Sequence, residues 1–402
     1  MAWTPYKETV ARLEKSFTCK ARVEVVGLME ARGRILARDS IAQENQPAFP
    51  TSEMDGYAIR YVDQEKGALT LTHRVPAGTE ISLHVGECEC IKTFTGSLLS
   101  EGADTIIPIE NVEVEGDKVR IVTAVKEGFA VRPVGEGYRA GDVMVTKGTR
   151  IGFAEIGVLA GLGCVQVPVV VRPRVAVLAT GSEIVDLGEA LPTPAHIRSS
   201  NHVTIAAMAQ HAGAEAVLLG IAGDDKALIK QRIVEGLACA DIVVTTGGVS
   251  VGDYDFVKDI IGDLAVETII EGADIKPGRH IRVVKVGEKY IVALPGFPYS
   301  SAVVFGLYGL RLVDAMLGRD YARRFCTATL EEEYAKRSKF TEFTACDVRE
   351  KEGKLFATLE GKKLGSSAIL NNLLGGATVL CIPKETTLLK KGENVEVLRL
   401  EM

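Results

Sequence analysis

One glycine-rich segment combines groups that could bind a phosphorylated ligand. Residues 245–258 read TTGGVSVGDYDFVK and follow the apolar run 242–244, which is typical of a buried strand. Glycines let backbone N–H groups approach an anion, and a helix start adds free N–H groups and a positive dipole end. Asp253 and Asp255 would repel a phosphate unless a divalent cation lies between them. The segment therefore predicts a magnesium-dependent site for a phosphorylated ligand.

The glycine spacing of this segment differs from two common nucleotide-binding motifs. It fits neither the P-loop nor G-x-G-x-x-G, which argues against an ordinary NTPase and against a nicotinamide enzyme. The sequence also predicts no Ser-His-Asp triad, because its histidines lie in no nucleophile motif.

Two acidic motifs follow predicted strands. Thr180-Gly181-Ser182-Glu183 comes after the strand expected at 175–179, where Glu183 either begins a helix or binds a ligand. Asp224 and Asp225 follow the next strand; one of them is expected to cap a helix, and the other could hold a metal or a ribose.

Two further turns offer cations or backbone amides. Lys276 and Arg279 flank a Pro-Gly turn, which is either a solvated basic turn or a site that neutralises an oxyanion; His280 is expected to be structural. The turn LPGFP at 294–298, with Pro295 and Gly296, could cradle an anion at the helix after it.

The N-terminal region contributes weaker signals. Asp55 in SEMDGYA either shapes a turn before Gly56 or belongs to a site, and Thr95 and Arg132 carry little information by themselves.

The elements that position the central motifs alternate between strand and helix. Three strands at 175–179, 216–221 and 242–245 are each followed by a helix, at 201–212, 227–238 and 254–261. A strand at 266–270, a hairpin at 281–286 and 290–293, and a helix at 300–316 complete the segment. This pattern predicts a doubly wound, mostly parallel α/β domain, in which ligands bind beyond the carboxyl ends of the strands.

The flanking regions are expected to be richer in β structure. Before the α/β domain we expect a helix in the first 20 residues, a short helix at 32–39, a strand-rich part at about 55–125, a helix at 151–162 and a strand at 165–171. After it, runs at 326–330, 354–359 and 378–382 predict a small β-barrel. The predicted domains are therefore 1–171, 172–318 and 319–402.

Bulk composition is that of an ordinary globular protein. The 402 residues are 47% hydrophobic and 25% charged, with a net charge of −6, which argues against a nucleic-acid partner. The first residues do not resemble a secretion signal, and no apolar run approaches the ~20 residues of a membrane span, so a cytoplasmic protein is expected. The eight cysteines are expected to be free thiols; a disulfide or metal role for Cys88 and Cys90 is the alternative.

The ordered set of motifs resembles the molybdopterin molybdenumtransferase family, which comprises the MoeA proteins and the gephyrin E domain. The resemblance covers nearly the whole chain and rests on SEMDGYA, TGS, the GE after Arg132, LATGSEIV, TTGGVSVGDYD, KPGR, LPGFP and the GSS at 365–367. Each motif is weak alone, but the ordered set is specific.

The resemblance implies an elongated, four-part protomer that forms a homodimer, with a cleft between the α/β domain of one subunit and the N-terminal region of the other. It implies Mg²⁺-dependent insertion of molybdate or tungstate into adenylylated molybdopterin, with release of AMP. Molybdopterin adenylyltransferase and target molybdoenzymes are then partners to consider.

The resemblance also assigns roles to residues of this chain. Asp55, Glu183, Asp255 and Lys276 are implied to be catalytic, and Glu183, Asp224, Asp253 and Asp255 to hold the metal. Binding of the substrate falls to Thr95, Arg132, Gly181, Ser182, Asp224, Gly247, Gly248, Ser250, Arg279, Pro295, Gly296 and Ser366.

Several positions depart from the family pattern. Gly137 stands where the family usually has an acid, Phe297 where it has asparagine, Gly272 where it sometimes has a basic residue, and Gly375 within its Ala-Asn-Gly element. These departures support the alternative of a divergent, non-catalytic paralogue that binds or delivers molybdenum cofactor. A third reading, another phosphoester hydrolase, leaves the large flanking regions unexplained.

Overall fold

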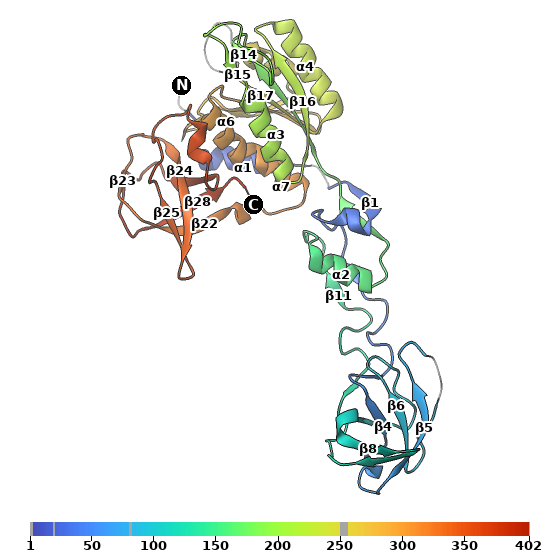
Figure 1. Cartoon of the computed structure of the whole chain (residues 1–402). Helices are drawn as coiled ribbons and strands as arrows, with labels where there is room; N and C mark the ends of the chain where they lie inside the picture. The colour runs from blue at the N-terminus through green and yellow to red at the C-terminus, as the bar shows by residue number, and fades with distance from the viewer. Residues whose placement is uncertain (1–2, 19–20, 80–82, 250–255, 402) are drawn as a thin grey trace. The chain divides into compact units, whose positions relative to one another are not determined.

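The structure, a computed structural model, describes residues 3–18, 21–79, 83–249 and 256–401 (Figure 1). The chain forms two compact units. The first consists of Met1–Val26, Gly33–Ala37 and Pro168–Met402, and the second of Gly27–Arg32 and Arg38–Val167. Each unit is described by itself.

A six-stranded sheet forms the centre of the first unit. Its strand order is β16-β13-β17-β21-β20-β18; the first four strands are parallel, and β20 and β18 run antiparallel to their neighbours. The bounds are β13 (Arg174–Thr180), β16 (Glu215–Ala222), β17 (Ile242–Thr246), β18 (Glu267–Glu271), β20 (Arg282–Val286) and β21 (Lys289–Leu294).

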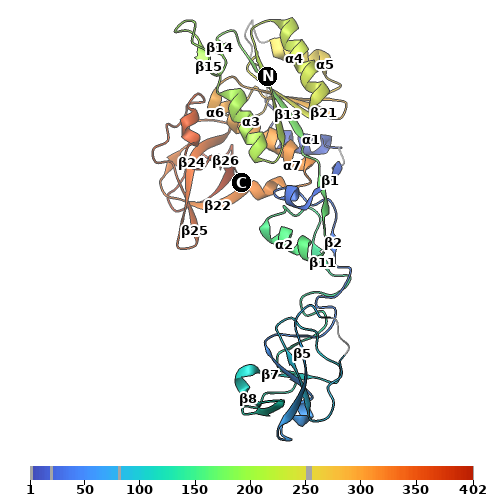
Figure 2. The same cartoon turned by 45° about the vertical axis from the view of Figure 1, so that its right-hand side comes forward.

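Helices cover both faces of this sheet (Figure 1 and Figure 2). Val175 and Val177 of β13 face a core shared with α3 (Asn201–His211), whereas Ala176 and Leu178 face a second core. That second core is shared with α4 (Lys226–Cys239) and α5 (Phe256–Leu264). Since alternate residues of a strand point to opposite faces, both must be apolar, which confirms the predicted doubly wound domain.

The parallel register brings the ends of four strands to one edge. Thr180 pairs with Ala222, Ala179 pairs with Thr246, and Thr246 pairs with Leu294. The turns that follow these strands therefore lie together, as the sequence predicts.

A small barrel forms the C-terminal part of the first unit. Five strands close through the pairing of β24 with β26, which confirms the predicted barrel. The bounds are β22 (Phe325–Leu330), β24 (Thr341–Lys351), β25 (Lys354–Thr358), β26 (Thr378–Ile382) and β28 (Asn394–Arg399). The helix expected at 300–316 is also present as α6 (Pro298–Val304), a π-helical turn (Phe305–Gly309) and α7 (Leu310–Met316).

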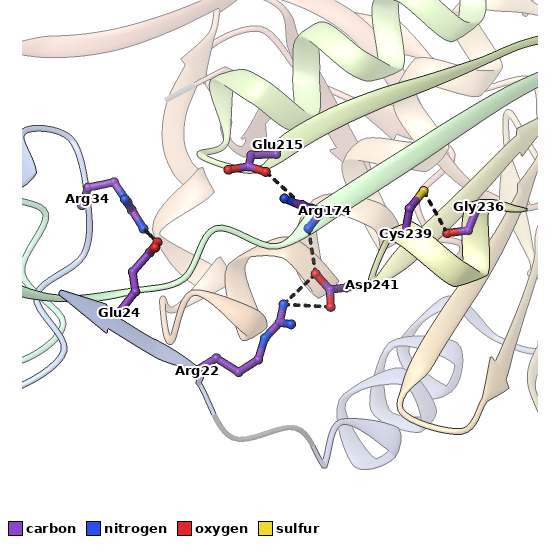
Figure 3. A network of polar contacts seen from close by, with 8 residues as sticks. All are labelled: Arg22, Glu24, Arg34, Arg174, Glu215, Gly236, Cys239 and Asp241. Atoms are coloured by element: carbon purple, nitrogen blue, oxygen red, sulfur yellow. Dashed lines mark hydrogen bonds and ion pairs between the residues drawn. The ribbon is translucent and has the colours of Figure 1, made fainter. Parts of the chain in front are cut away.

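The N-terminal segment of the first unit contacts the α/β sheet where its strands begin. Its helix α1 (Tyr6–Ser16) buries Leu13 in the core. Figure 3 shows that Asp241 accepts hydrogen bonds from the Arg22 side chain at 2.8 and 2.9 Å and from the Arg174 backbone N–H at 2.8 Å. Arg174 also donates to Glu215 at 3.0 Å. These contacts connect Arg22, which follows α1, to the first residues of β13 and β16.

The second unit contains a six-stranded sheet of order β7-β4-β6-β5-β9-β8, which confirms the predicted strand-rich part. Its bounds are β4 (Gly56–Ile59), β5 (Leu69–Val75), β6 (Glu89–Thr93), β7 (Thr105–Pro108), β8 (Val112–Glu115) and β9 (Lys118–Ile121). Smaller elements are β2 (Ser40–Ile41), β3 (Thr51–Ser52), β10 (Val131–Arg132), β11 (Val143–Val145) and the predicted helix α2 (Phe153–Gly161).

The helix expected at 32–39 is wrong. Only a short 3-10 turn, Leu28–Ala31, precedes this segment, and Gly33 follows it with φ of +77°. Ile35 then accepts a hydrogen bond from the Val170 N–H at 2.8 Å, and Leu36 forms an isolated bridge with Val169. Strand-like pairing within the first unit thus overrides the local helical pattern.

Among the helices in the described part of the chain, none has the length and apolar character that a membrane span needs.

Candidate functional site

A cavity of about 810 Å³ lies at the carboxyl edge of the parallel strands, within the first unit. Its walls come from the turns after β13, β16, β17 and β21 and from β24 of the barrel. The structure thereby brings together ten of the predicted site residues, all of which line the cavity. They are Gly181, Glu183, Asp224, Gly247, Gly248, Lys276, Arg279, Pro295, Gly296 and Ser366.

Two glycines after β17 are required by the geometry of the cavity wall. Gly247 and Gly248 have φ of +99° and +67°, and a Cβ on Gly247 would lie 2.8 Å from the backbone oxygen of Thr180. The Gly247 N–H donates to the Leu294 oxygen at 3.0 Å. Of the two glycine amides that we expect at a phosphate, the Gly247 amide is therefore already engaged.

The acidic side of the cavity joins the ends of β13 and β16. The Ser182 N–H donates to Asp224 Oδ2 at 3.2 Å, and the Asp224 N–H donates to Ser182 Oγ at 2.9 Å. Asp225 caps α4 by accepting from the N–H groups of Ala227 and Leu228, which confirms that one of the two aspartates is an N-cap. Asp224 is left exposed at the cavity.

Glu183 lies close to the backbone of the same turn. Gly181 has φ of +137°, and a Cβ built there would lie 2.5 Å from Glu183 Oε2. The carboxylate therefore folds back over Gly181, at the exposed rim of the cavity.

The basic side of the cavity is built by the turn after β19 (Ile275–Lys276). The Lys276–Pro277 peptide bond is cis, and Lys276 Nζ lies 3.7 Å from Glu342 Oε2. The Arg279 guanidinium carbon lies 4.5 Å from the centroid of the Phe340 ring, a cation–π contact that restrains this side chain. Two cations therefore face the cavity from one turn.

The LPGFP turn borders the cavity with Pro295, Gly296 and Phe297, and its role as an anion cradle stays a prediction. The Ser300 N–H donates to the Ser367 oxygen at 3.0 Å, and the Ser301 N–H donates to the Phe297 oxygen at 2.8 Å, so both amides are engaged by the protein. The Phe297 side chain is 60% exposed at the rim. Ser366 Oγ accepts from the Ala368 N–H at 3.3 Å.

The predicted residues of the second unit form two separate contacts there. Asp55 accepts hydrogen bonds from the Thr95 N–H at 2.9 Å and the Thr95 hydroxyl at 3.0 Å. The backbone hydrogen bond is the main cause that holds the pKa of the exposed Asp55 carboxyl below its usual value, followed by the hydroxyl. Arg132 instead donates to Glu136 at 2.6 Å.

Three predicted residues, Ser250, Asp253 and Asp255, lie outside the described residues. Among the predicted metal ligands, Glu183 and Asp224 are thus the two that the structure places.

The structure adds cavity residues that sequence reasoning missed. Glu342 of β24 is buried in the wall, and Asn201 at the start of α3 donates to the Gly296 oxygen at 2.7 Å. No sequence signal could have found Glu342, because only the pairing of β24 with β19 brings it here. Asn201 begins the helix that follows β13 and its turn at the ligand side of the sheet, and this position is a weak sequence signal for a cavity residue.

A serine, a histidine and an aspartate also contact one another near the cavity, of which only Ser199 lines it. Ser199 Oγ and His202 Nδ1 share a hydrogen bond, and His202 Nε2 lies 3.4 Å from Asp186 Oδ1. Ser199 also donates its N–H to the Val185 oxygen. Since Ser199 and His202 are three residues apart at the start of α3, this chain of contacts anchors the helix start to β14 (Ile184–Val185).

One acidic cluster in the second unit is already neutralised. Asp63, Glu87 and Cys88 lie close enough to hold a metal ion. Lys66 Nζ, however, lies 2.9 Å from Asp63 Oδ1 and 2.8 Å from Glu87 Oε1. The Lys66 ammonium therefore forms ion pairs with both carboxylates of the cluster. The thiols of Cys88 and Cys90 are free in the structure, in agreement with the expected free thiols.

Comparison with known proteins agrees with this architecture. Residues 4–163 match the family described as the MoeA N-terminal region (domain I and II), and residues 176–315 match a probable molybdopterin binding domain. The molybdopterin molybdenumtransferase of Nostoc sp. is 31% identical, covering 94% of this chain and 88% of the relative. The chain belongs to the molybdopterin molybdenumtransferase family.

Other members of the molybdopterin molybdenumtransferase family are similarly close. The enzyme of Bacillus subtilis is 30% identical, covering 98% of this chain and 93% of the relative. Two crystal structures of the molybdopterin biosynthesis MoeA protein from Pyrococcus horikoshii superpose with TM-scores of 0.87 and 0.82 at 28% identity. They cover 100% and 99% of this chain and 100% of their own, which confirms the predicted fold class.

Proposed function

We propose that this protein inserts molybdenum from molybdate, or tungsten from tungstate, into adenylylated molybdopterin and releases AMP in a Mg²⁺-dependent reaction. The observation that carries the proposal is the cavity at the strand ends, where carboxylates of Glu183 and Asp224 face the same space as the cations of Lys276 and Arg279. A diphosphate link between a pterin and a nucleoside needs groups of both kinds.

The cations would stabilise the charge that develops as the diphosphate link breaks. Lys276 acts as a compact point charge, whereas Arg279, restrained by its cation–π contact with Phe340, offers a planar set of donors to phosphate oxygens. Gly247 and Gly248 keep the wall free of side chains, which lets the substrate approach the backbone closely.

The carboxylates fit Mg²⁺ as one or two protein ligands. Mg²⁺ prefers oxygen donors and commonly takes one or two carboxylates together with substrate phosphates and waters. Asp224 is oriented by its two hydrogen bonds with Ser182, and Glu183 lies exposed at the rim. We include Asp253 and Asp255 in the proposed set. A bound Mg²⁺ would offset the negative charge of the phosphates and polarise the bond that breaks.

The proposal extends to the second unit and to assembly. Asp55 is proposed to be catalytic, and Thr95 and Arg132 to bind the substrate, in a homodimer. Sedimentation of the purified protein tests the dimer.

AMP release tests the reaction. Purified protein would be incubated with adenylylated molybdopterin and Mg²⁺, with molybdate, with tungstate, or with neither, and AMP measured by chromatography. We expect release that depends on the oxyanion and stops when EDTA removes the metal. Glu183→Gln should lose most of this activity, whereas Glu267→Gln, an exposed change on β18, should keep it. Tight substrate binding without AMP release would contradict the enzyme and support a carrier.

A further inference from the structure

Lys276 and Glu342 are opposite each other across a short strand pair. β19 and β24 pair in parallel, with Ile275 beside Thr341 and Lys276 beside Glu342. This pairing connects the α/β part of the first unit to the barrel, so the relative placement of the two side chains is set by the backbone register.

The Glu342 carboxylate is held rigidly on one oxygen and left open on the other. Its side chain is 2% exposed, and Oε1 accepts hydrogen bonds from the Tyr334 hydroxyl and, at 3.0 Å, the Thr344 hydroxyl. Oε2 is buried with no hydrogen-bond partner among the described residues. Burial raises the pKa of Glu342, but contacts with Tyr334, then Ser338, and then the charge of Lys276 lower it more, so its pKa stays below the usual value.

A buried charge without a hydrogen-bond partner attracts the nearest cation. Lys276 Nζ is 3.7 Å from Glu342 Oε2, which is an ion-pair distance but too long for a hydrogen bond. The lysine side chain keeps 33% of its surface exposed and lines the cavity. The ammonium is therefore restrained by charge while its N–H groups remain available to a ligand.

We propose that Glu342 is a positioning residue that orients the Lys276 ammonium toward the oxyanion in the cavity. The inference rests on the proposed function, because it assigns to Lys276 an anionic substrate group. A cation held on one side by a rigid carboxylate gives up little mobility when the substrate binds.

This role predicts a separation of binding from turnover. Glu342→Gln keeps the Oε1 acceptor for Tyr334 and Thr344 but removes the charge that restrains Lys276. Loss of a negative charge near the cavity should leave inorganic phosphate binding unchanged or make it up to about threefold tighter. A misplaced ammonium should lower kcat by about tenfold, because positioning groups act mainly in the transition state.

Turnover of four variants tests whether Glu342 acts through Lys276. Glu342→Asp retains the charge and should restore part of kcat, and the double variant Glu342→Gln/Lys276→Met should be no slower than Lys276→Met alone. A further loss in the double variant would overturn the proposal, and so would parallel losses of phosphate affinity, kcat and thermal stability in Glu342→Gln, which would mean a structural role.

A second readout needs no turnover and separates this proposal from the proposed function. In protein labelled with ¹³C-lysine, the Cε signal of Lys276, identified by its loss in Lys276→Met, should show restricted motion in the wild type and greater mobility in Glu342→Gln. The signal of the exposed Lys126, in the second unit, serves as the control. Unchanged Lys276 mobility would overturn the positioning role, even if AMP release were confirmed; AMP release could fail while this result stands.

Discussion

Ser182 and Asp224 bind each other through two reciprocal hydrogen bonds, each from the backbone N–H of one residue to the side chain of the other. The residues follow neighbouring parallel strands, 42 positions apart in the chain. This pair joins the ends of the two strands at the acidic side of the cavity, which Asp224 lines.

Ser182→Ala should disturb Asp224 without unfolding the protein. The change removes one hydrogen bond at an exposed position, for which we expect a loss of about 0.5–1.5 kcal/mol in the free energy of unfolding. AMP release should require more Mg²⁺, because the Asp224 backbone loses its hydrogen bond to Ser182 Oγ and only the Ser182 N–H still holds the carboxylate of this proposed ligand. A titration of activity against Mg²⁺ checks this; Ser182→Thr, which keeps the hydroxyl, is the control, and an unchanged Mg²⁺ requirement would count against Asp224 as a ligand.

Gly247→Ala should be damaging, because the backbone has φ of +99° and the new Cβ would lie 2.8 Å from the Thr180 backbone oxygen. Strain of this kind costs about 1–3 kcal/mol. Urea unfolding measures the loss. Gly287→Ala, which has φ of +60° but no heavy atom within 4 Å of the new Cβ, is the matched control for steric contact. Equal losses of unfolding free energy in both variants would mean that the positive φ, and not the contact with the Thr180 oxygen, causes the destabilisation.

Phe297→Asn should raise molybdate-dependent activity. The family usually has asparagine at this position, and the exposed Phe297 ring offers the cavity rim no hydrogen bond. The rate of AMP release against molybdate concentration is the measurement. Phe297→Leu separates loss of the ring from gain of the amide, and no change in molybdate dependence would mean that the departure is neutral.

Asp255→Asn should abolish metal-dependent turnover and leave the fold intact. Asp255 belongs to the proposed metal set, although it lies outside the described residues. Circular dichroism checks the fold, and AMP release checks the activity. Asp259→Asn, four residues later on α5 and exposed, is the control. Normal AMP release by Asp255→Asn would remove this residue from the mechanism.

The Asp55–Thr95 pair should weaken in acid. Because the folded-state pKa of Asp55 is lowered, its contribution is present above the unfolded pKa of about 3.9 and is lost as pH falls through the lower folded pKa. The carboxyl ¹³C signal of Asp55 should therefore titrate below that value. Thr95→Val should raise the pKa of Asp55 only in part, since the stronger backbone hydrogen bond remains. Thr123→Val is the control and should not alter this pKa. An unchanged pKa in Thr95→Val would mean that the Thr95 hydroxyl does not contribute to lowering it.

The sequence by itself determined the alternation of strands and helices, the barrel and ten of the residues that line the cavity. This was possible because local patterns carry the information: apolar runs of strand length, glycine-rich turns, and the position of those turns directly after the predicted strands. From parallel topology alone, Glu183, Asp224 and Gly247 had to reach one edge of the sheet.

Only the tertiary structure decided which of these groups are free to act. It showed that Asp225 caps a helix while Asp224 faces the cavity, and that the amides of Gly247 and Ser300 are engaged by the protein. It also placed Glu342 beside Lys276 and replaced the expected helix at 32–39 by strand-like pairing. These outcomes depend on hydrogen-bond partners that are distant in the chain, and no local pattern specifies which distant partner a group will find.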